Sequence, residues 1–123
     1  MDTKTKDKFE QALSRFTGST QLYKHKILDN SITFTEGVKY VADEGHAWWL
    51  PDLILSYQWM PRVSREEFQV WILLKQKDET WTITCTDGND KVLCGQHLAY
   101  SDFPIESLKL YVVDNTIMLP SEY

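Results

Sequence analysis

The sequence predicts an α+β fold, with N-terminal helices packed on one face of a four- to five-stranded antiparallel meander sheet. Apolar residues recur at helical spacing in the first half of the chain and alternate at strand spacing in the second half. There is no β-α-β alternation and no glycine-rich phosphate loop, so a doubly wound nucleotide-binding fold is not expected. The 123 residues fit a single domain, with a helical part over about 6–60 and a sheet part over about 68–119.

Two helices are expected before residue 46. Apolar side chains share one face over 6–16, which predicts the first helix. Thr35 is a good N-cap for the second helix, because its hydroxyl can accept a hydrogen bond from a free backbone N–H. Gly45 is expected to end that helix. Between the two, an extended segment over 22–28 and a short strand near 32–34 precede Thr35.

A third helix is expected to begin near Trp49 or Leu50 and to run to about Trp59, because Pro51 is tolerated only in a first turn. This helix is apolar on more than one side, which indicates that it lies between two layers or meets a partner. One apolar stripe of this helix consists of Leu53, Ile54, Tyr57 and Met60. A second apolar set lies off that stripe and consists of Leu50, Leu55 and Trp59.

Strands joined by short turns are expected in the second half of the chain. The segment 80–86 alternates most clearly, with Trp81, Ile83 and Cys85 on one face. Residues 62–67 are interpreted as a connection, although Ser64 and Glu67 have the spacing of a helical capping box, so a helix is the alternative. The five expected strands are 68–75, 80–86, 91–98, 106–113 and 116–119.

The two cysteines flank a predicted hairpin turn. A two-residue turn centred on Gly88-Asn89 places Cys85 opposite Val92, so that Cys85 and Cys94 are not direct partners. A disulfide between them would need a bulge or a register shift. Free buried thiols are therefore expected, as in a reducing compartment. The chain offers no set of Cys and His at the short spacing of a zinc site.

Charge and hydropathy exclude several classes of protein. Residues 1–40 hold seven basic and five acidic side chains, and residues 41–123 hold six and thirteen. The acidic segment 41–123 repels phosphate, so sequence-independent nucleic-acid binding is not expected. A partner protein with a basic surface would complement this charge. No apolar run is long enough to span a membrane, and the polar start lacks a secretory apolar segment. The expected location is the cytoplasm.

A group of acids and a histidine near the second helix end is the first candidate for chemistry. Asp43, Glu44, His46 and Asp52 include groups that bind metals or transfer protons. Glu44, His46 and Asp52 would serve a metal-dependent hydrolase or lyase, which is the alternative function. The competing interpretation is structural: Asp52, in the first turn of the third helix, accepts hydrogen bonds from backbone N–H groups there.

Aromatic residues around the third helix are the candidate partner-binding site. Five tryptophans are many for a chain of 123 residues, and tryptophan is a common interface anchor. Trp48 and Trp49 are adjacent, so they cannot both face the core. The residues expected to bind a partner are Trp48, Trp49, Trp59, Asp52 and Tyr57.

The segment Thr35 to Ile54, T-E-G-V-K-Y-V-A-D-E-G-x-A-W-W-L-x-D-L-I, resembles a family of short uncharacterised bacterial proteins, as do Phe16-Thr17-Gly18 and Tyr23 upstream. Members of that family are often encoded on phage, plasmid and other mobile DNA, so the resemblance implies an accessory role. It implies no activity, cofactor or catalytic residue.

These observations favour a small non-catalytic protein that binds another protein or itself, without a metal or another cofactor. The simplest version is a homodimer through the helix 49–59, since two-fold dimers are the commonest assembly. A sharper version is an inhibitor of a host nucleic-acid enzyme, in which Asp87, Asp90 and Asp102 stand where phosphates would bind.

Overall fold

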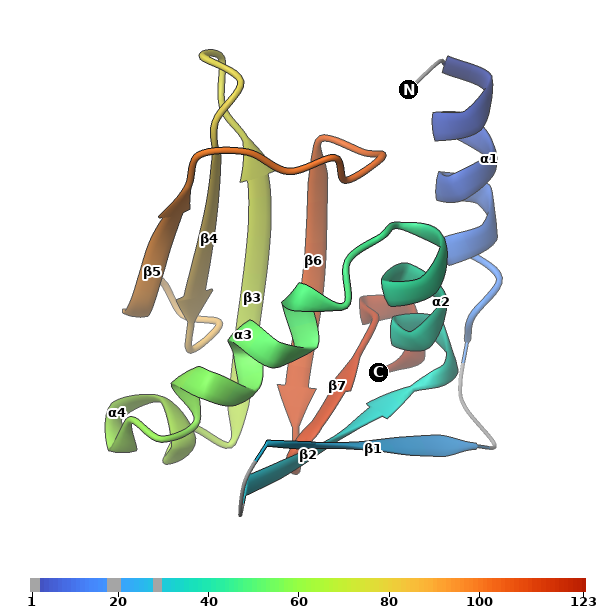
Figure 1. Ribbon diagram of the computed structural model, residues 1–123. Helices are drawn as coiled ribbons and strands as arrows, with labels where there is room; N and C mark the ends of the chain where they lie inside the picture. Colours follow the sequence, from blue (N-terminus) through green and yellow to red (C-terminus); the bar gives the residue numbers. More distant parts are fainter. Residues whose placement is uncertain (1–2, 18–20, 28–29) are drawn as a thin grey trace.

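The computed structural model describes residues 3–17, 21–27 and 30–123 and shows an α+β fold (Figure 1). The helices within these residues are α1 (Thr3–Leu13), α2 (Glu36–Glu44), α3 (Trp49–Tyr57), α4 (Pro61–Ser64) and a C-terminal 3₁₀ turn, η1 (Pro120–Glu122). The strands are β1 (Leu22–Ile27), β2 (Asn30–Thr35), β3 (Phe68–Lys75), β4 (Trp81–Thr86), β5 (Val92–Leu98), β6 (Ser107–Val113) and β7 (Thr116–Met118). None of these helices has the length and apolarity to cross a membrane.

All seven strands form one mixed sheet in the order β1-β2-β7-β6-β3-β4-β5. The expected sheet of four to five antiparallel strands is therefore too small, because β1 and β2 join it from the N-terminal half. The expectation of an entirely antiparallel sheet is also wrong, since β2 pairs in parallel with β7. The remaining neighbours pair antiparallel.

The chain leaves the predicted meander after β5. The connection 99–106 runs back across the end of the sheet, so that β6 pairs with β3 instead of β5 (Figure 1). In that connection Phe103 and Ile105 are buried, and the Phe103 ring makes edge contacts with Phe9 and Trp81. This burial of apolar side chains holds the crossing segment on the core.

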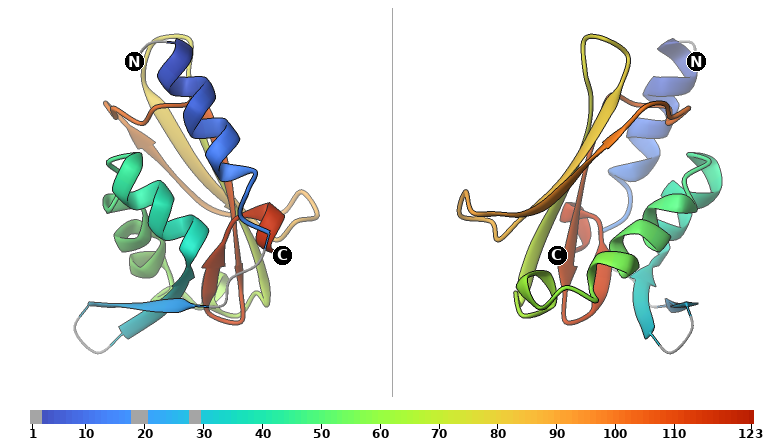
Figure 2. Two further views of the ribbon diagram at one scale, coloured as in Figure 1. Left: turned by 90° about the vertical axis from the view of Figure 1, so that its right-hand side faces the viewer. Right: turned by 60° about the vertical axis from the view of Figure 1, so that its left-hand side comes forward.

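The core lies between the sheet and the helices, and it draws on both halves of the chain (Figure 2). Trp71 and Trp81 are each only 2% exposed, and they take positions in the core on the face that α3 covers. Side chains also pack on the second face of the sheet, whereas the sequence predicted packing on one face only. At the C-terminus, Tyr123 contacts Phe68 and Tyr111, which lie on the opposite face of the sheet.

The helix boundaries differ from the predicted ones by a few residues. The first helix occupies Thr3–Leu13 instead of 6–16, and α3 ends at Tyr57 instead of Trp59. The expected connection at 62–67 is partly the short helix α4, which starts at Pro61 and so does not use the Ser64 capping box. Proline suits the first position of a helix because its missing N–H would be unpaired there in any case.

The β4–β5 hairpin has a longer turn than expected and a β-bulge. Asp87 N–H donates to the Lys91 carbonyl, and Asp90 has a φ of 70°. A register shift between Cys85 and Thr86 then places Cys85 directly opposite Cys94. The prediction that these cysteines are not direct partners is therefore wrong, because the sequence shows neither the extra turn residue nor the bulge. Both thiols are free.

The start of α2 is tied to the C-terminal turn. Thr35 is the N-cap, as predicted, and its hydroxyl accepts a hydrogen bond from Val38 N–H at 3.3 Å. The Thr35 hydroxyl donates to Glu122 Oε1 at 2.6 Å, and the backbone N–H groups of Gly37 and Leu119 donate to the same carboxylate. A carboxylate at this position also suits the positive end of the helix dipole.

At the end of α2, one residue caps the helix and the next residue adopts the left-handed conformation, whereas a single glycine often does both. Gly45 caps the helix, as predicted, but its φ of −90° is open to any residue. His46 takes the left-handed conformation, with a φ of 53°. Gly45 is needed for space instead, because a Cβ atom there would lie 2.5 Å from the Val41 carbonyl oxygen and 2.8 Å from the Phe103 ring.

Candidate functional site

The acids and the histidine that the sequence singled out are not gathered in one place. Asp43 pairs with Lys39, Asp52 pairs with His25, and Glu44 and His46 are exposed at the end of α2. Over the described ranges, no three or more His, Cys, Asp and Glu side chains are arranged to hold a metal ion. Glu44, His46 and Asp52 therefore do not form the ligand group that the alternative function requires.

Asp52 makes a tertiary contact instead of the predicted cap. Its carboxylate contacts His25 Nε2, from β1, and α3 has no side-chain cap at its start. Tyr23 and His25 share the face of β1 that looks toward the helices, while Lys24 and Lys26 point the other way. The pair thus fastens an edge strand to the first turn of α3.

The candidate partner-binding residues surround α3, and we call Trp48, Trp49, Asp52, Tyr57 and Trp59 the α3 surface. Trp48 is 42% exposed and Trp59 is 58% exposed, at opposite ends of the helix. Trp49 and Tyr57 are partly buried against the core. As expected, the adjacent Trp48 and Trp49 do not both enter the core.

The remaining apolar residues of α3 are covered. Leu50, Ile54 and Leu55 are buried, so both apolar sides of the helix meet the protein interior. Asp52 and Ser56 lie on the exposed side of the helix, so the wide apolar surface of α3 packs on the single core cluster. Tyr57 leans toward the sheet edge, where its hydroxyl donates to Gln96 Oε1 of β5 at 3.0 Å. The exposed apolar area is thus confined to the two ends of α3.

A small pocket lies beside α2, on the side of the Trp48 end of α3. We call it the α2 pocket, and its volume is about 290 Å³. Three aromatic side chains and three acids line it, together with one lysine from the same helix. These residues are Phe16, Tyr23, Tyr40, Glu36, Asp43, Glu44 and Lys39.

Lys39 is the cation of the α2 pocket. Its Nζ lies 2.8 Å from Asp43 Oδ2 and 5.7 Å from the centre of the Tyr23 ring. The hydrogen bond to Asp43 raises the pKa of the Lys39 ammonium and lowers the pKa of the Asp43 carboxyl. Both groups are therefore charged at neutral pH, and the ammonium rests against the negative face of an aromatic ring.

Trp48 connects the α2 pocket to the α3 surface. Its indole N–H donates to Asp43 Oδ1 at 2.9 Å, and its ring makes an edge contact with Phe34. Phe34 in turn stacks on Tyr23, with ring centres 5.5 Å apart. Trp48 and Tyr23 therefore pack on the same buried ring, Phe34, and Trp48 and Lys39 both bond to Asp43.

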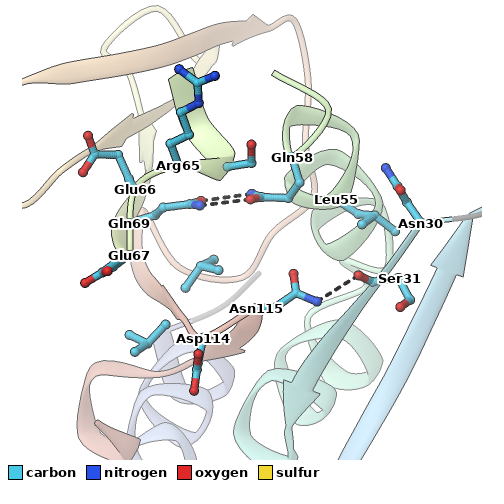
Figure 3. Close-up of a pocket in the computed structure, with 13 residues that line it drawn as sticks. Asn30, Ser31, Leu55, Gln58, Arg65, Glu66, Glu67, Gln69, Asp114 and Asn115 are labelled. Carbon is cyan, nitrogen blue, oxygen red and sulfur yellow. Dashed lines mark hydrogen bonds between the residues drawn. The ribbon is translucent and has the colours of Figure 1, made fainter. Parts of the chain in front are cut away.

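A larger pocket of about 730 Å³ opens at the other end of α3 (Figure 3). Its lining includes the side chains of Gln58 and Gln69, whose amides donate to each other at 2.9 Å in both directions. Gln69 also donates to the Val63 carbonyl and accepts from the Trp71 indole N–H. Across the pocket, Asn115 donates to the Ser31 carbonyl at 3.0 Å.

This amide network fastens α3 and α4 to β3 and leaves little for a ligand. Gln69 is 2% exposed, yet all its polar atoms have partners. Figure 3 shows the carboxylates of Glu66 and Glu67 pointing away from the amide pair. Throughout the described part of the chain, no buried side-chain nitrogen or oxygen lacks a hydrogen-bond partner.

Sequence reasoning found Trp48 and Trp59 but missed the α2 pocket. One local signal was available, because Lys39 and Asp43 are four positions apart on a predicted helix and therefore lie side by side. The contribution of Tyr23 had no such signal. It depends on β1 pairing with β2 next to α2, which is a tertiary arrangement.

Comparison with known proteins places the chain in a family but gives no activity. Residues 7–123 match a family of unknown function, DUF6876. No curated protein and no solved structure gives a significant match.

Proposed function

This chain belongs to that family of unknown function, and we propose that it acts by binding another protein through the α3 surface. One observation carries the proposal: Trp48 and Trp59 keep 42% and 58% of their surface exposed, while Trp71 and Trp81 fill the core. Large exposed aromatic side chains cost free energy in water, and tryptophan is enriched among the residues that dominate interface energy.

The expected partner carries a basic surface. The chain has 18 acidic and 13 basic side chains, and carboxylates border the Trp48 end of the α3 surface. Complementary charge speeds the encounter of two proteins and disfavours wrong partners. A second copy of the chain is the simplest alternative partner, through the homodimer at helix 49–59 predicted above.

Inhibition of a nucleic-acid enzyme through Asp87, Asp90 and Asp102 is a less favoured form of this function. The Asp87 carboxylate accepts hydrogen bonds from Asn89 and Lys91 backbone N–H groups, so it shapes the β4–β5 turn. The acids around the α2 pocket lie next to an exposed tryptophan and are better placed for a partner. We propose no reaction for this protein.

Affinity capture from the native host tests the proposal. The baits are the wild-type protein, the double variant Trp48→Ala with Trp59→Ala, and the control variant Tyr100→Ala, which removes an exposed ring on the β5–β6 connection. We expect the wild type and the control to capture the same protein in near-stoichiometric amount, and the double variant to lose it while retaining its circular dichroism spectrum.

Sedimentation from micromolar to millimolar concentration tests the second copy as the partner. A dimer that the double variant no longer forms would support self-association through the α3 surface. A wild-type protein that stays monomeric, and captures nothing that depends on Trp48 or Trp59, overturns the proposal.

A further inference from the structure

We propose that the α2 pocket binds a lysine or arginine side chain of the partner protein, in the place that the chain's own Lys39 ammonium now occupies. This inference rests on the proposed protein-binding function and names the chemistry of the partner at one end of the α3 surface.

The walls of the α2 pocket suit a cation. Aromatic rings attract a cation through the negative potential of their faces, and the attraction grows when the cation loses water. Phe16 contacts Tyr40 with ring centres 5.6 Å apart, and Tyr23 stacks on Phe34 at 5.5 Å, so the rings are held in position. The carboxylates of Glu36, Asp43 and Glu44 supply the opposite charge.

Lys39 already places a cation of the chain itself at the α2 pocket. Its ammonium contacts both kinds of wall at once, an aromatic face from Tyr23 and a carboxylate oxygen from Asp43. A lysine from a partner could make the same two contacts. The guanidinium of an arginine would suit the site further, since its flat face stacks on rings and its N–H groups match a carboxylate.

Lys39 is held weakly enough to be displaced. The Lys39 and Asp43 side chains are 42% and 40% exposed, and exposed ion pairs of this kind add little stability. An ion pair four positions apart on a helix is weaker when the lysine precedes the acid, as Lys39 precedes Asp43, because this order opposes the helix dipole. After displacement, the lysine side chain can extend into water.

Asp43 provides separate oxygens for the two contacts. Oδ1 accepts from the Trp48 indole and Oδ2 accepts from Lys39. An incoming cation would therefore exchange with Lys39 at Oδ2 while the Trp48 hydrogen bond remains. The Trp48 indole N–H then reports on the exchange, because it donates to the other oxygen of the same Asp43 carboxylate.

The test is a titration followed by the indole signals in a ¹H–¹⁵N spectrum, with the Trp48 signal assigned from Trp48→Phe. The probe is acetyl-arginine amide, and its neutral isostere acetyl-citrulline amide is the control. We expect saturable movement of the Trp48 signal with the arginine probe and none with the citrulline probe. Lys39→Gln removes the internal competitor and should tighten the binding of the arginine probe roughly threefold to tenfold.

Three variants of the protein sharpen the test. Tyr23→Leu and Asp43→Asn should abolish the response to the arginine probe, while Lys26→Gln, which removes a lysine on the opposite face of β1, should leave it unchanged. Equal responses to both probes, or no tightening in Lys39→Gln, would overturn the inference. The titration needs no partner protein, so its failure is distinguishable from failure of the α3 surface to capture one.

Discussion

Gly37 leaves the space that the Glu122 carboxylate fills at the start of α2. A Cβ atom at this position would lie 2.5 Å from Glu122 Oε1 and 2.6 Å from Leu119 Cδ1. We expect Gly37→Ala to lower the free energy of unfolding by roughly 1–3 kcal/mol, as overpacking does, in urea denaturation. The control is Gly95→Ala, because a Cβ atom there meets its nearest neighbour at 3.4 Å, close to ordinary contact.

A double variant separates crowding from other effects of the Gly37 substitution. Glu122→Ala removes the hydrogen bonds to Thr35 and to the Gly37 backbone, and it also removes the carboxylate that the new methyl group would meet, while Leu119 stays in place. The two substitutions should therefore destabilise less together than the sum of their single effects. Strict additivity would show that the Gly37 cost arises elsewhere.

His46 occupies a backbone conformation that glycine adopts more easily. Its φ of 53° is in the left-handed region and its side chain is exposed. We expect His46→Gly to raise the free energy of unfolding, by up to about 1 kcal/mol, since relief of strain outweighs the added freedom of the unfolded chain. Gly45→Ala should do the reverse, because its Cβ atom would meet the Val41 carbonyl. Thermal unfolding of both variants tests this contrast.

At the scale of elements, the β4–β5 hairpin illustrates what local sequence can and cannot predict. The alternation over 80–86 predicts the buried face of β4, which is observed. The register across the turn is not predictable from the same pattern. One additional turn residue and one bulge each shift the pairing by one position, and a shift of one position exchanges the faces of a strand.

The thiols of this hairpin are expected to react slowly. Burial raises the pKa of the Cys85 thiol, and the neighbouring Cys94 raises it further; burial also raises the pKa of Cys94. Since the thiolate is the reactive form, both cysteines should react with an aromatic disulfide reagent only slowly at pH 8 in the native protein and rapidly after unfolding. A matched exposed thiol is Val92→Cys, which should react at once. Rapid native reaction of Cys85 or Cys94 would contradict the burial of Cys85 and the partial burial of Cys94.

The contact between His25 and Asp52 holds β1 to α3 and should matter locally. The Asp52 side chain is 55% exposed, so the pair contributes at most about 1 kcal/mol. We expect Asp52→Ala to speed amide hydrogen exchange in β1 while the rest of the sheet keeps its protection. Ser56→Ala, one turn further along α3, is the control. A fall of protection throughout the molecule would show that this contact supports more than the edge strand.

At the scale of the whole molecule, strand order is what the sequence could not reveal. The segments 68–75, 80–86 and 91–98 form consecutive hairpins as predicted, because turns and alternation are local signals. The return of β6 to β3 depends on buried residues of the connection, such as Phe103, and no local pattern encodes it. The candidate site also combines local and tertiary features. The exposed tryptophans were predictable from the sequence, whereas the α2 pocket depends on the pairing of β1 with β2 beside α2.

The C-terminal turn joins elements that are far apart in the sequence. Glu122 accepts hydrogen bonds at the start of α2, and Tyr123 contacts Phe68 and Tyr111 on the outer face of the sheet. Removal of residues 120–123 should therefore lower the free energy of unfolding by roughly 2–3 kcal/mol, the sum expected for a helix cap and aromatic contacts. The melting temperature should fall by roughly 10 °C.

Hydrogen exchange shows whether that loss spreads across the molecule. If the turn connects β7 to α2, its removal should reduce the protection of the Val38 amide, which bonds to the Thr35 hydroxyl, as well as that of β7 itself. Tyr123→Ala is the control, since it removes ring contacts and keeps the Glu122 carboxylate, and it should leave the Val38 amide protected. Loss of protection confined to β7 after truncation would mean that α2 is held by the sheet and the core alone.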